Sequence, residues 1–230
     1  TGKIVLKGSA NQNVNMGGFT IPNLEIDNTS NVTLTGNAKV SGDVLFTNGR
    51  IQLGSNNLSL GAAGTITGAG STKFVVTNGT GRLIKSGLSS TAFTYPVGNS
   101  TSNYNPVSIT NSGTANDIGV RAFSTVLSAG STGTAFSREV VNNSWDVSET
   151  VAGGSNLTLS TTWNAVDELP GFDRARGGIA NYLSSPAGWD LLQSQTAAAT
   201  GTNPYSVSRS GITNVGVFAV GTRSLMVPLL

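Results

Sequence analysis

The chain has 230 residues, a net charge of +2, and neither cysteine nor histidine. The lack of these two residue types excludes disulfides, zinc sites built from Cys or His, and nucleophilic catalysis by Ser-His-Asp or Cys-His arrangements. The basic residues are few and scattered and no window reaches about 18 consecutive apolar residues, so we expect neither a nucleic-acid partner nor a transmembrane helix.

Residues 20–85 carry pairs of apolar residues separated by one intervening residue. Period-two spacing places both members of a pair on the same face of a strand. Asn and Gly between the pairs tolerate the backbone conformations of tight turns and predict strands of only three to five residues. The pairs are Leu24 and Ile26, Val32 and Leu34, Val44 and Phe46, Ile51 and Leu53, and Leu58 and Leu60.

A longer period overlies these pairs, because Asn28, Asn48 and Asn78 each follow an apolar strand pattern. A coil of about 20 residues built from short strands is typical of a parallel β-solenoid. We therefore predict a solenoid-like region over residues 1–90. Its interior would hold Leu24, Ile26, Leu34, Phe46, Leu53 and Leu60. The Asn-Gly dipeptides leave a meander of hairpins as the alternative.

Strand patterns become longer and richer in aromatic residues after Tyr95, which predicts an antiparallel, immunoglobulin-like β-sandwich over residues 91–224. Trp145 and Trp163 lie in strand patterns on the same face as the apolar residues Val147 and Leu159, so we expect both rings in the core. Trp189 lies in a predicted loop, where it could contact a glycan or pack inside. Candidate strands are Val107–Thr110, Ile118–Phe123, Glu139–Val147, Asn156–Trp163, Tyr205–Arg209 and Val215–Val220.

The acidic tract that contains Asp167, Glu168 and Asp173 is the main candidate for chemistry. Its oxygens could bind calcium, or two of its carboxylates could flank a glycosidic bond. Arg174 and Arg176 lie in the same tract, and local ion pairs explain it without a ligand. We assign no catalytic residue, and we expect the fold to need no cofactor.

Four segments resemble large repetitive surface proteins of Bacteroidota: Phe93–Asn99, Tyr104–Val107, Trp163–Tyr182 and Phe218–Gly221. The resemblance covers roughly residues 20–224. It implies an adhesin or surface-layer protein, with strand repeats leading into a sandwich and export by the type IX system. The shared motifs mark architecture and turns, so they imply no catalytic residue. The C-terminal sorting domain of those proteins does not follow here, and the start at Thr1 predicts a processed product.

Both ends of the sequence are apolar. Ile4 and Leu6 lie in a strand pattern without an obvious hairpin partner, and residues 225–230 form an apolar tail that includes Leu225, Val227 and Leu229. Strand addition or solenoid stacking against another copy would cover such ends. Packing on the same chain is the alternative.

These patterns favour a non-enzymatic structural or adhesive protein on the extracellular surface of a Gram-negative bacterium. Its expected partners are other copies of itself, joined through the termini into a fibre or filament. The absence of Cys and the presence of only two Met suit a long-lived extracellular protein. A carbohydrate-binding module with glycan partners and a polysaccharide-cleaving solenoid enzyme are the alternatives.

Overall fold

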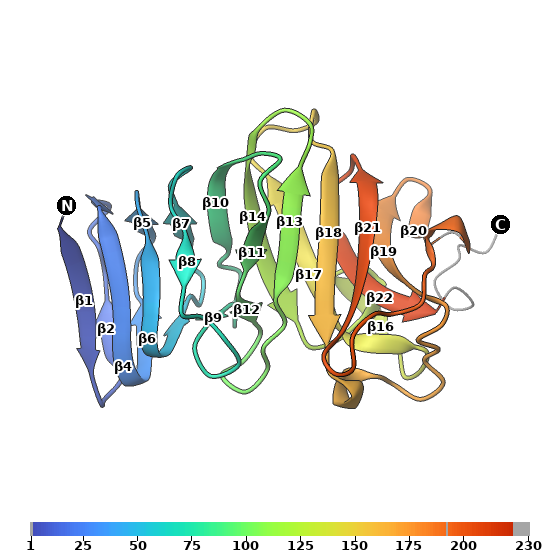
Figure 1. The fold of residues 1–230 in the computed structure, drawn as a ribbon, viewed down its shortest axis with the longest axis horizontal. Helices are drawn as coiled ribbons and strands as arrows, with labels where there is room; N and C mark the ends of the chain where they lie inside the picture. The colour runs from blue at the N-terminus through green and yellow to red at the C-terminus, as the bar shows by residue number, and fades with distance from the viewer. Residues whose placement is uncertain (1, 192, 223–230) are drawn as a thin grey trace.

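The computed structural model describes residues 2–191 and 193–222, which form an elongated, essentially all-β molecule. A parallel coil of short strands lies at one end of the long axis, and antiparallel sheets lie at the other (Figure 1). The predicted combination of a parallel solenoid with antiparallel sheets is confirmed. Within the described ranges, no helix is long and apolar enough to cross a membrane.

The solenoid has three faces, and strands of successive coils pair in parallel on each face. The first face contains β1 (Lys3–Gly8), the start of β4 (Asn23–Leu34), the start of β6 (Val44–Gln52) and β8 (Ile66–Thr67). The second contains β2 (Gln12–Val14), the ends of β4 and β6, β9 (Val75–Val76) and β12 (Val97–Gly98). The third contains β3 (Thr20–Ile21), β5 (Ala38–Val40), β7 (Leu58–Leu60) and β10 (Leu83–Leu88).

The predicted interior of the coil is confirmed. The six residues expected there are all buried, with 0–3% of their surface exposed: Leu24, Ile26, Leu34, Phe46, Leu53 and Leu60. Leu24 lies beside Val44 and Ile26 beside Phe46 in the parallel register. Stacked coils bury these side chains against the neighbouring coil, because one coil is too thin to enclose them. Parallel pairing excludes the hairpin meander.

The strands of the coil are longer than predicted, since β4 has 12 residues and β6 has 9. Both continue past the expected turn residues with a shift in register instead of ending there. At the bend of β6, Gly49 has a φ of 74°. A Cβ atom on Gly49 would lie 1.8 Å from the main-chain oxygen of Asn28, so this corner requires glycine.

Asn28 and Asn48, which are 20 residues apart, do not lie side by side in the ladder. Asn48 lies beside Asp27 rather than Asn28 in the ladder. Asn28 is fully buried, and its amide donates to the main-chain oxygen of Ala10 at 2.9 Å. Asn28 and Asn48 therefore lie at the same bend of successive coils but one position out of register, and Asn48 donates to Asp27 Oδ1 at 2.7 Å.

Other polar side chains do repeat once per coil. Asn23 Oδ1 accepts a hydrogen bond from the Asp43 N–H at 2.9 Å, and Asp43 Oδ1 accepts one from the Thr65 N–H at 2.8 Å. At another corner, Asn37 Oδ1 accepts one from the Asn57 N–H at 2.8 Å. Each bond joins a side chain of one coil to the main chain of the next. These bonds satisfy main-chain groups at the turns and hold neighbouring coils in register.

Asp43→Asn is expected to reduce the acid sensitivity of the coil while leaving it folded at neutral pH. The hydrogen bonds from the Thr65 main chain and hydroxyl lower the pKa of Asp43 below its ordinary value of 3.8. Because the pKa of Asp43 is lower in the folded state, its ionised carboxylate stabilises the fold at pH values above the unfolded-state pKa. That stabilisation is lost as the pH falls from about 5 through the lowered pKa. An asparagine oxygen can accept the same bonds, as Asn23 does one coil earlier.

Urea unfolding of both proteins at neutral and acidic pH would check this prediction. Asp43→Ala serves as the control, because it removes the acceptor as well as the charge and should weaken the fold at both pH values. An equal loss of stability on acidification in the parent chain and Asp43→Asn would contradict the assignment.

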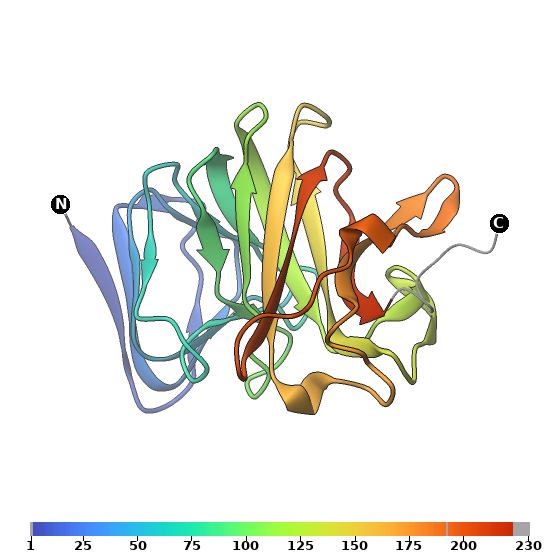
Figure 2. The same cartoon turned by 45° about the vertical axis from the view of Figure 1, so that its right-hand side comes forward.

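The antiparallel part consists of two sheets that pack around one core (Figure 2). The nine-stranded sheet continues from β10 through β14 (Asn116–Phe123), β17 (Val140–Glu149), β22 (Val217–Thr222), β19 (Gly177–Ser184) and β20 (Ala187–Trp189). The four-stranded sheet contains β11 (Phe93–Tyr95), β13 (Val107–Asn111), β18 (Leu157–Trp163) and β21 (Tyr205–Ile212). A hairpin of β15 (Leu127–Ala129) and β16 (Thr132–Ala135) and two 3-10 turns, η1 (Ala165–Asp167) and η2 (Gln193–Gln195), complete the described elements.

No break in packing separates the two predicted regions. β10 pairs in parallel with β7 and antiparallel with β14, so one sheet crosses the expected boundary at residue 90. β12, beyond that boundary, still pairs in parallel with β9 of the coil. A single apolar cluster includes Leu83 of the coil and Leu159 of the sandwich. The change from parallel to antiparallel pairing is therefore a change within one packing unit.

An ion-pair cluster ties the last coil to the sandwich. Arg82, just before β10, donates to the main-chain oxygen of Asp146 at 2.7 Å and to Asp146 Oδ2 at 2.6 Å. Arg121 of β14 donates to the same carboxylate oxygen at 3.0 Å. The three side chains retain only 14–22% of their accessible surface. One carboxylate is thus shared by two guanidinium groups where little water reaches them.

Candidate functional site

The first coil of the solenoid ends in open strand edges. β1 pairs with β4 on one side, and it is the terminal strand of its sheet in the described part of the chain. β3 likewise ends the nine-stranded sheet. An edge strand presents main-chain N–H and C=O groups that can pair with another strand. The start of the coil is therefore a surface on which a further strand or coil could add.

Apolar side chains accompany these open edges. Ile4, Val5 and Phe19 are 40%, 44% and 76% exposed, whereas the predicted assembly residue Leu6 is half-buried against the core. Exposed apolar groups beside a free strand edge are typical of interaction surfaces. The interior of the solenoid is thus only partly covered at this end.

Sequence reasoning found Ile4 and Leu6 but missed Phe19, Val14 and Met16. Val14 and Met16 are half-buried and pack against the same core. They form an apolar pair with one residue between them, like the pairs between residues 20 and 85. Extending that pattern backwards by one coil would have identified them.

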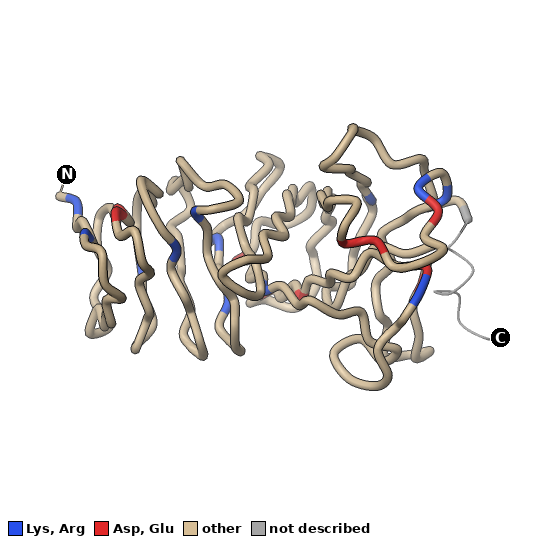
Figure 3. The backbone as a smooth tube through the Cα atoms, turned by 90° about the horizontal axis from the view of Figure 1, so that it is seen from below, with Lys and Arg blue, Asp and Glu red and all other residues tan. Residues whose placement is uncertain are grey.

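Charges at this end are paired within the chain. Lys3 forms an ion pair with Glu25 of the next coil, and Lys7 forms one with Asp27 at 3.0 Å. The hydrogen bond from Lys3 lowers the pKa of Glu25, and those from Asn48 and then Lys7 lower the pKa of Asp27. Charged residues are sparse along the coil (Figure 3). The open end therefore offers main-chain groups and apolar side chains more than uncompensated charge.

The opposite end of the molecule offers different edges. Among the described residues, β20 is the last strand of the nine-stranded sheet at this end, and β21 is the last strand of the four-stranded sheet. The other predicted assembly residues, Leu225, Val227 and Leu229, lie outside the described residues. The two ends of the molecule therefore differ, because strands pair in parallel at one end and antiparallel at the other, and their sequences are unlike.

The acidic tract does not form a common site. Glu168 accepts hydrogen bonds from Arg174 at 2.7 and 2.8 Å, and Asp173 accepts one from Arg176 at 2.8 Å. Asp167 accepts a hydrogen bond from the Asn164 N–H at 2.9 Å and caps η1. No group of three acidic side chains that could hold a metal ion occurs in residues 2–191 and 193–222. Local ion pairs therefore account for Glu168 and Asp173, and the candidate calcium ligands do not converge.

The tryptophans lie in the interior. Trp145 and Trp163 are 0% and 2% exposed, which confirms their predicted core positions. Trp189, the candidate for glycan contact, is 4% exposed on β20 rather than in a loop. Its indole N–H donates to the main-chain oxygen of Leu127 at 3.2 Å, and its ring packs against Tyr182. A sugar would need an exposed ring face, so burial corrects that expectation.

Comparisons with protein-family models, curated proteins and solved structures found no match to the chain. The resemblance to surface proteins of Bacteroidota therefore remains a prediction from the four segments that carry it. The open coil and the rest of the described surface carry the features from which a function can be inferred.

Proposed function

We propose that this chain is a non-enzymatic structural or adhesive module that joins end to end with other copies of itself on an extracellular bacterial surface. The observation that carries the proposal is the open first coil, in which free strand edges lie beside exposed Ile4, Val5 and Phe19. We propose that the opposite end of a second copy binds to this coil. The sequence-level resemblance and the absence of cysteine support the location on a Gram-negative surface.

The arrangement of the ends favours a filament over a closed dimer. The parallel coil and the antiparallel sheets lie at opposite ends of the long axis (Figure 1). A contact between unlike ends is heterologous, and such contacts propagate unless the rotation closes a ring. Strand addition would supply main-chain hydrogen bonds, and burial of apolar side chains would add about 25 cal/mol per Å².

The enzymatic alternative needs two carboxylates on opposite sides of a bond in one cleft. A cavity at the junction of coil and sandwich contains one carboxylate, that of Asp167. Glu168 and Asp173 are engaged by arginines instead of facing each other across a cleft. The geometry therefore supports a structural role better than glycoside hydrolysis.

The double variant Ile4→Lys with Phe19→Lys is expected to abolish assembly and leave the monomer folded. Both side chains are exposed, so their replacement removes little core packing, whereas two added charges at the joint oppose association. Size-exclusion chromatography with light scattering and electron microscopy would measure the polymer. Val151→Lys is the matched control, because Val151 is 67% exposed on the loop between β17 and β18 and does not belong to the first coil.

Removal of residues 225–230 tests whether the C-terminal end takes part in the proposed contact between copies. We expect the truncated chain to remain folded as a monomer and to lose the polymer. Unfolding on truncation would instead place the tail in the core of its own chain. A parent chain that stays monomeric at every concentration, or assembly that persists in the double lysine variant, would contradict the proposal.

A further inference from the structure

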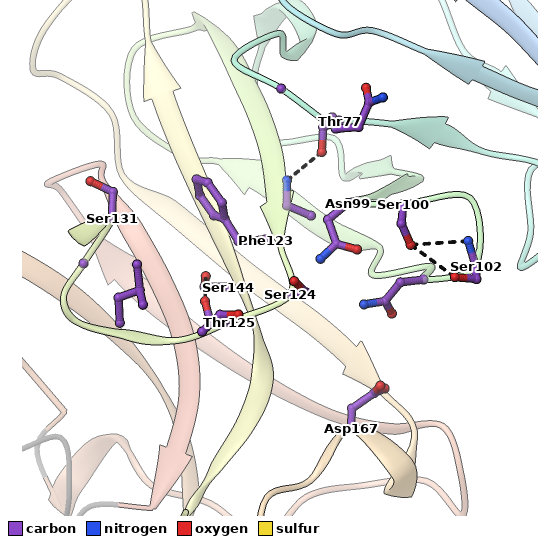
Figure 4. A pocket seen from close by; sticks show the side chains of 16 residues that line it. Thr77, Asn99, Ser100, Ser102, Phe123, Ser124, Thr125, Ser131, Ser144 and Asp167 are labelled. Atoms are coloured by element: carbon purple, nitrogen blue, oxygen red, sulfur yellow. Dashed lines mark hydrogen bonds between the residues drawn. The ribbon is translucent and has the colours of Figure 1, made fainter. Parts of the chain in front are cut away.

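A second feature, independent of assembly, is a cavity of about 730 Å³ where the last coil meets the sandwich. Its walls come from six separate segments, including the turn after β9, the loop after β12 and the loop after β14. Figure 4 shows Asn99, Ser100 and Ser102 on one side, Ser131 on the other, and Asp167 at η1. The volume lies within the range of about 300–1,000 Å³ that is typical of small-molecule sites.

Small polar residues are common in the lining of the cavity, and charged residues are rare. Ten of the 16 lining residues are Ser, Thr or Asn, Asp167 is the only acidic one, and none of the 16 is Lys or Arg. Phosphate and carboxylate ligands are held by cationic side chains or by converging main-chain N–H groups. This lining lacks such cations, so it favours a neutral ligand with many hydroxyl groups.

One buried acceptor in the wall has no partner within the described chain. Asn99 Oδ1 is buried and accepts no hydrogen bond. The Asp167 carboxylate uses Oδ2 to cap η1, which leaves Oδ1 free to accept another bond. A buried acceptor without a partner is costly unless water or a ligand supplies a donor. A ligand hydroxyl could supply the missing donor to Asn99 Oδ1, and the half-buried Asp167 carboxylate could accept a further bond.

An aromatic side chain completes the wall. Phe123, at the end of β14, lines the cavity. The Arg121 guanidinium lies 4.7 Å from the centre of its ring, and the same guanidinium is held by Asp146 and by the Gly79 carbonyl. This network fixes the ring and one wall of the cavity in place. Arg121 covers one face of the ring, and the part of the half-buried ring that lines the cavity can contact C–H groups of a ligand.

We propose that this cavity binds a neutral saccharide. Sugar hydroxyls both donate and accept hydrogen bonds, which matches Asn, Ser and Thr side chains, and the C–H face of a sugar packs on an aromatic ring. A peptide strand would instead need an open sheet edge, whereas β14 and β17, which line part of the cavity, are inner strands of their sheet and loops form most of the remaining wall. Asn99 and Asp167 accept hydrogen bonds from sugar hydroxyls, and Phe123 packs against the ring of the sugar.

Isothermal titration calorimetry with maltotetraose, cellotetraose, mannotetraose and chitobiose tests the proposal, with tetragalacturonate as the acidic counterpart. We expect saturable binding of at least one neutral sugar and none of the acid. Asn99→Ala should weaken that binding about threefold to tenfold, which is the net value of one hydrogen bond. Asn142→Ala is the matched control, because Asn142 lies outside the cavity on β17.

Ser131→Trp is a second test variant, and it leaves the hydrophobic core unchanged. Ser131 is an exposed turn residue in the wall, so a large ring there should fill the cavity without unfolding the chain. Thermal melting would verify the fold of each variant. Absence of binding by all four neutral sugars, equal binding of tetragalacturonate, or full binding by the Ser131→Trp variant would overturn the proposal. None of these results depends on whether copies assemble.

Discussion

Replacing Phe46 with alanine is expected to lower the free energy of unfolding by about 3–5 kcal/mol. Phe46 is 1% exposed on β6, and it lies beside Ile26 of the preceding coil. Alanine would leave a cavity inside the coil. Parallel main-chain bonds and turn side chains hold the neighbouring coils in place, so the walls cannot easily collapse into the space. Urea unfolding followed by tryptophan fluorescence would measure the loss.

Lys39→Ala is the control for that measurement. Lys39 is exposed in the middle of β5, so its replacement should change the free energy of unfolding by no more than about 0.5 kcal/mol. Because one sheet and one core span the coil and the sandwich, we expect a single unfolding transition in both variants. A loss below about 1 kcal/mol for Phe46→Ala would show that the side chain does not fill the coil.

Replacing Asp146 with alanine is expected to destabilise the fold by about 3 kcal/mol, because it leaves two arginines uncompensated. Arg82 and Arg121 both donate to Asp146 Oδ2 where little water reaches them. The value lies at the lower end of the range for buried pairs, since 14–22% of each side-chain surface remains accessible. Asp146→Asn, which keeps the shape and removes the charge, would separate charge from packing in the same urea experiment.

Asp173→Ala provides the matched comparison. Asp173 pairs with Arg176, whose side chain is 74% exposed, so the surrounding water screens the interaction. A surface pair of this kind contributes between zero and about 1 kcal/mol. Equal effects of Asp146→Ala and Asp173→Ala would contradict the view that the Arg82–Asp146–Arg121 cluster joins the coil to the sandwich.

The two proposals place their functions at different parts of the molecule. Assembly uses the open first coil, whereas the cavity lies at the junction with the sandwich. A filament built through the ends would carry one such cavity on each subunit. Many weak saccharide sites on one filament would raise the overall affinity for a polysaccharide surface far above that of a single site.

The solenoid could be predicted because its signal is local. Pairs such as Leu24 with Ile26 and Leu58 with Leu60 show which side chains share a strand face, and they recur often enough to suggest coils. The same periodicity identified six strands of the sandwich within a few residues. It missed β19, where the run from Gly177 to Ala180 is buried on both faces and shows no alternation. It also missed β16, whose four residues are all exposed.

The register of the coils could not be predicted, because a turn pattern does not specify which residues stack. Asn28 and Asn48 occupy similar sequence contexts, yet Asn48 stacks beside Asp27. Asn23 and Asp43 do form hydrogen bonds from one coil to the next, although nothing in their local sequence distinguishes them from other turn residues.

By itself, the sequence determined the all-β class, the coil interior and the core positions of Trp145 and Trp163, because each follows from spacing along one strand. Only the tertiary structure decided how distant segments meet. It showed that one sheet crosses the boundary at residue 90, that Trp189 is buried, and that six segments enclose the cavity beside Phe123. Such features depend on contacts between residues far apart in the chain, and local periodicity carries no information about those contacts.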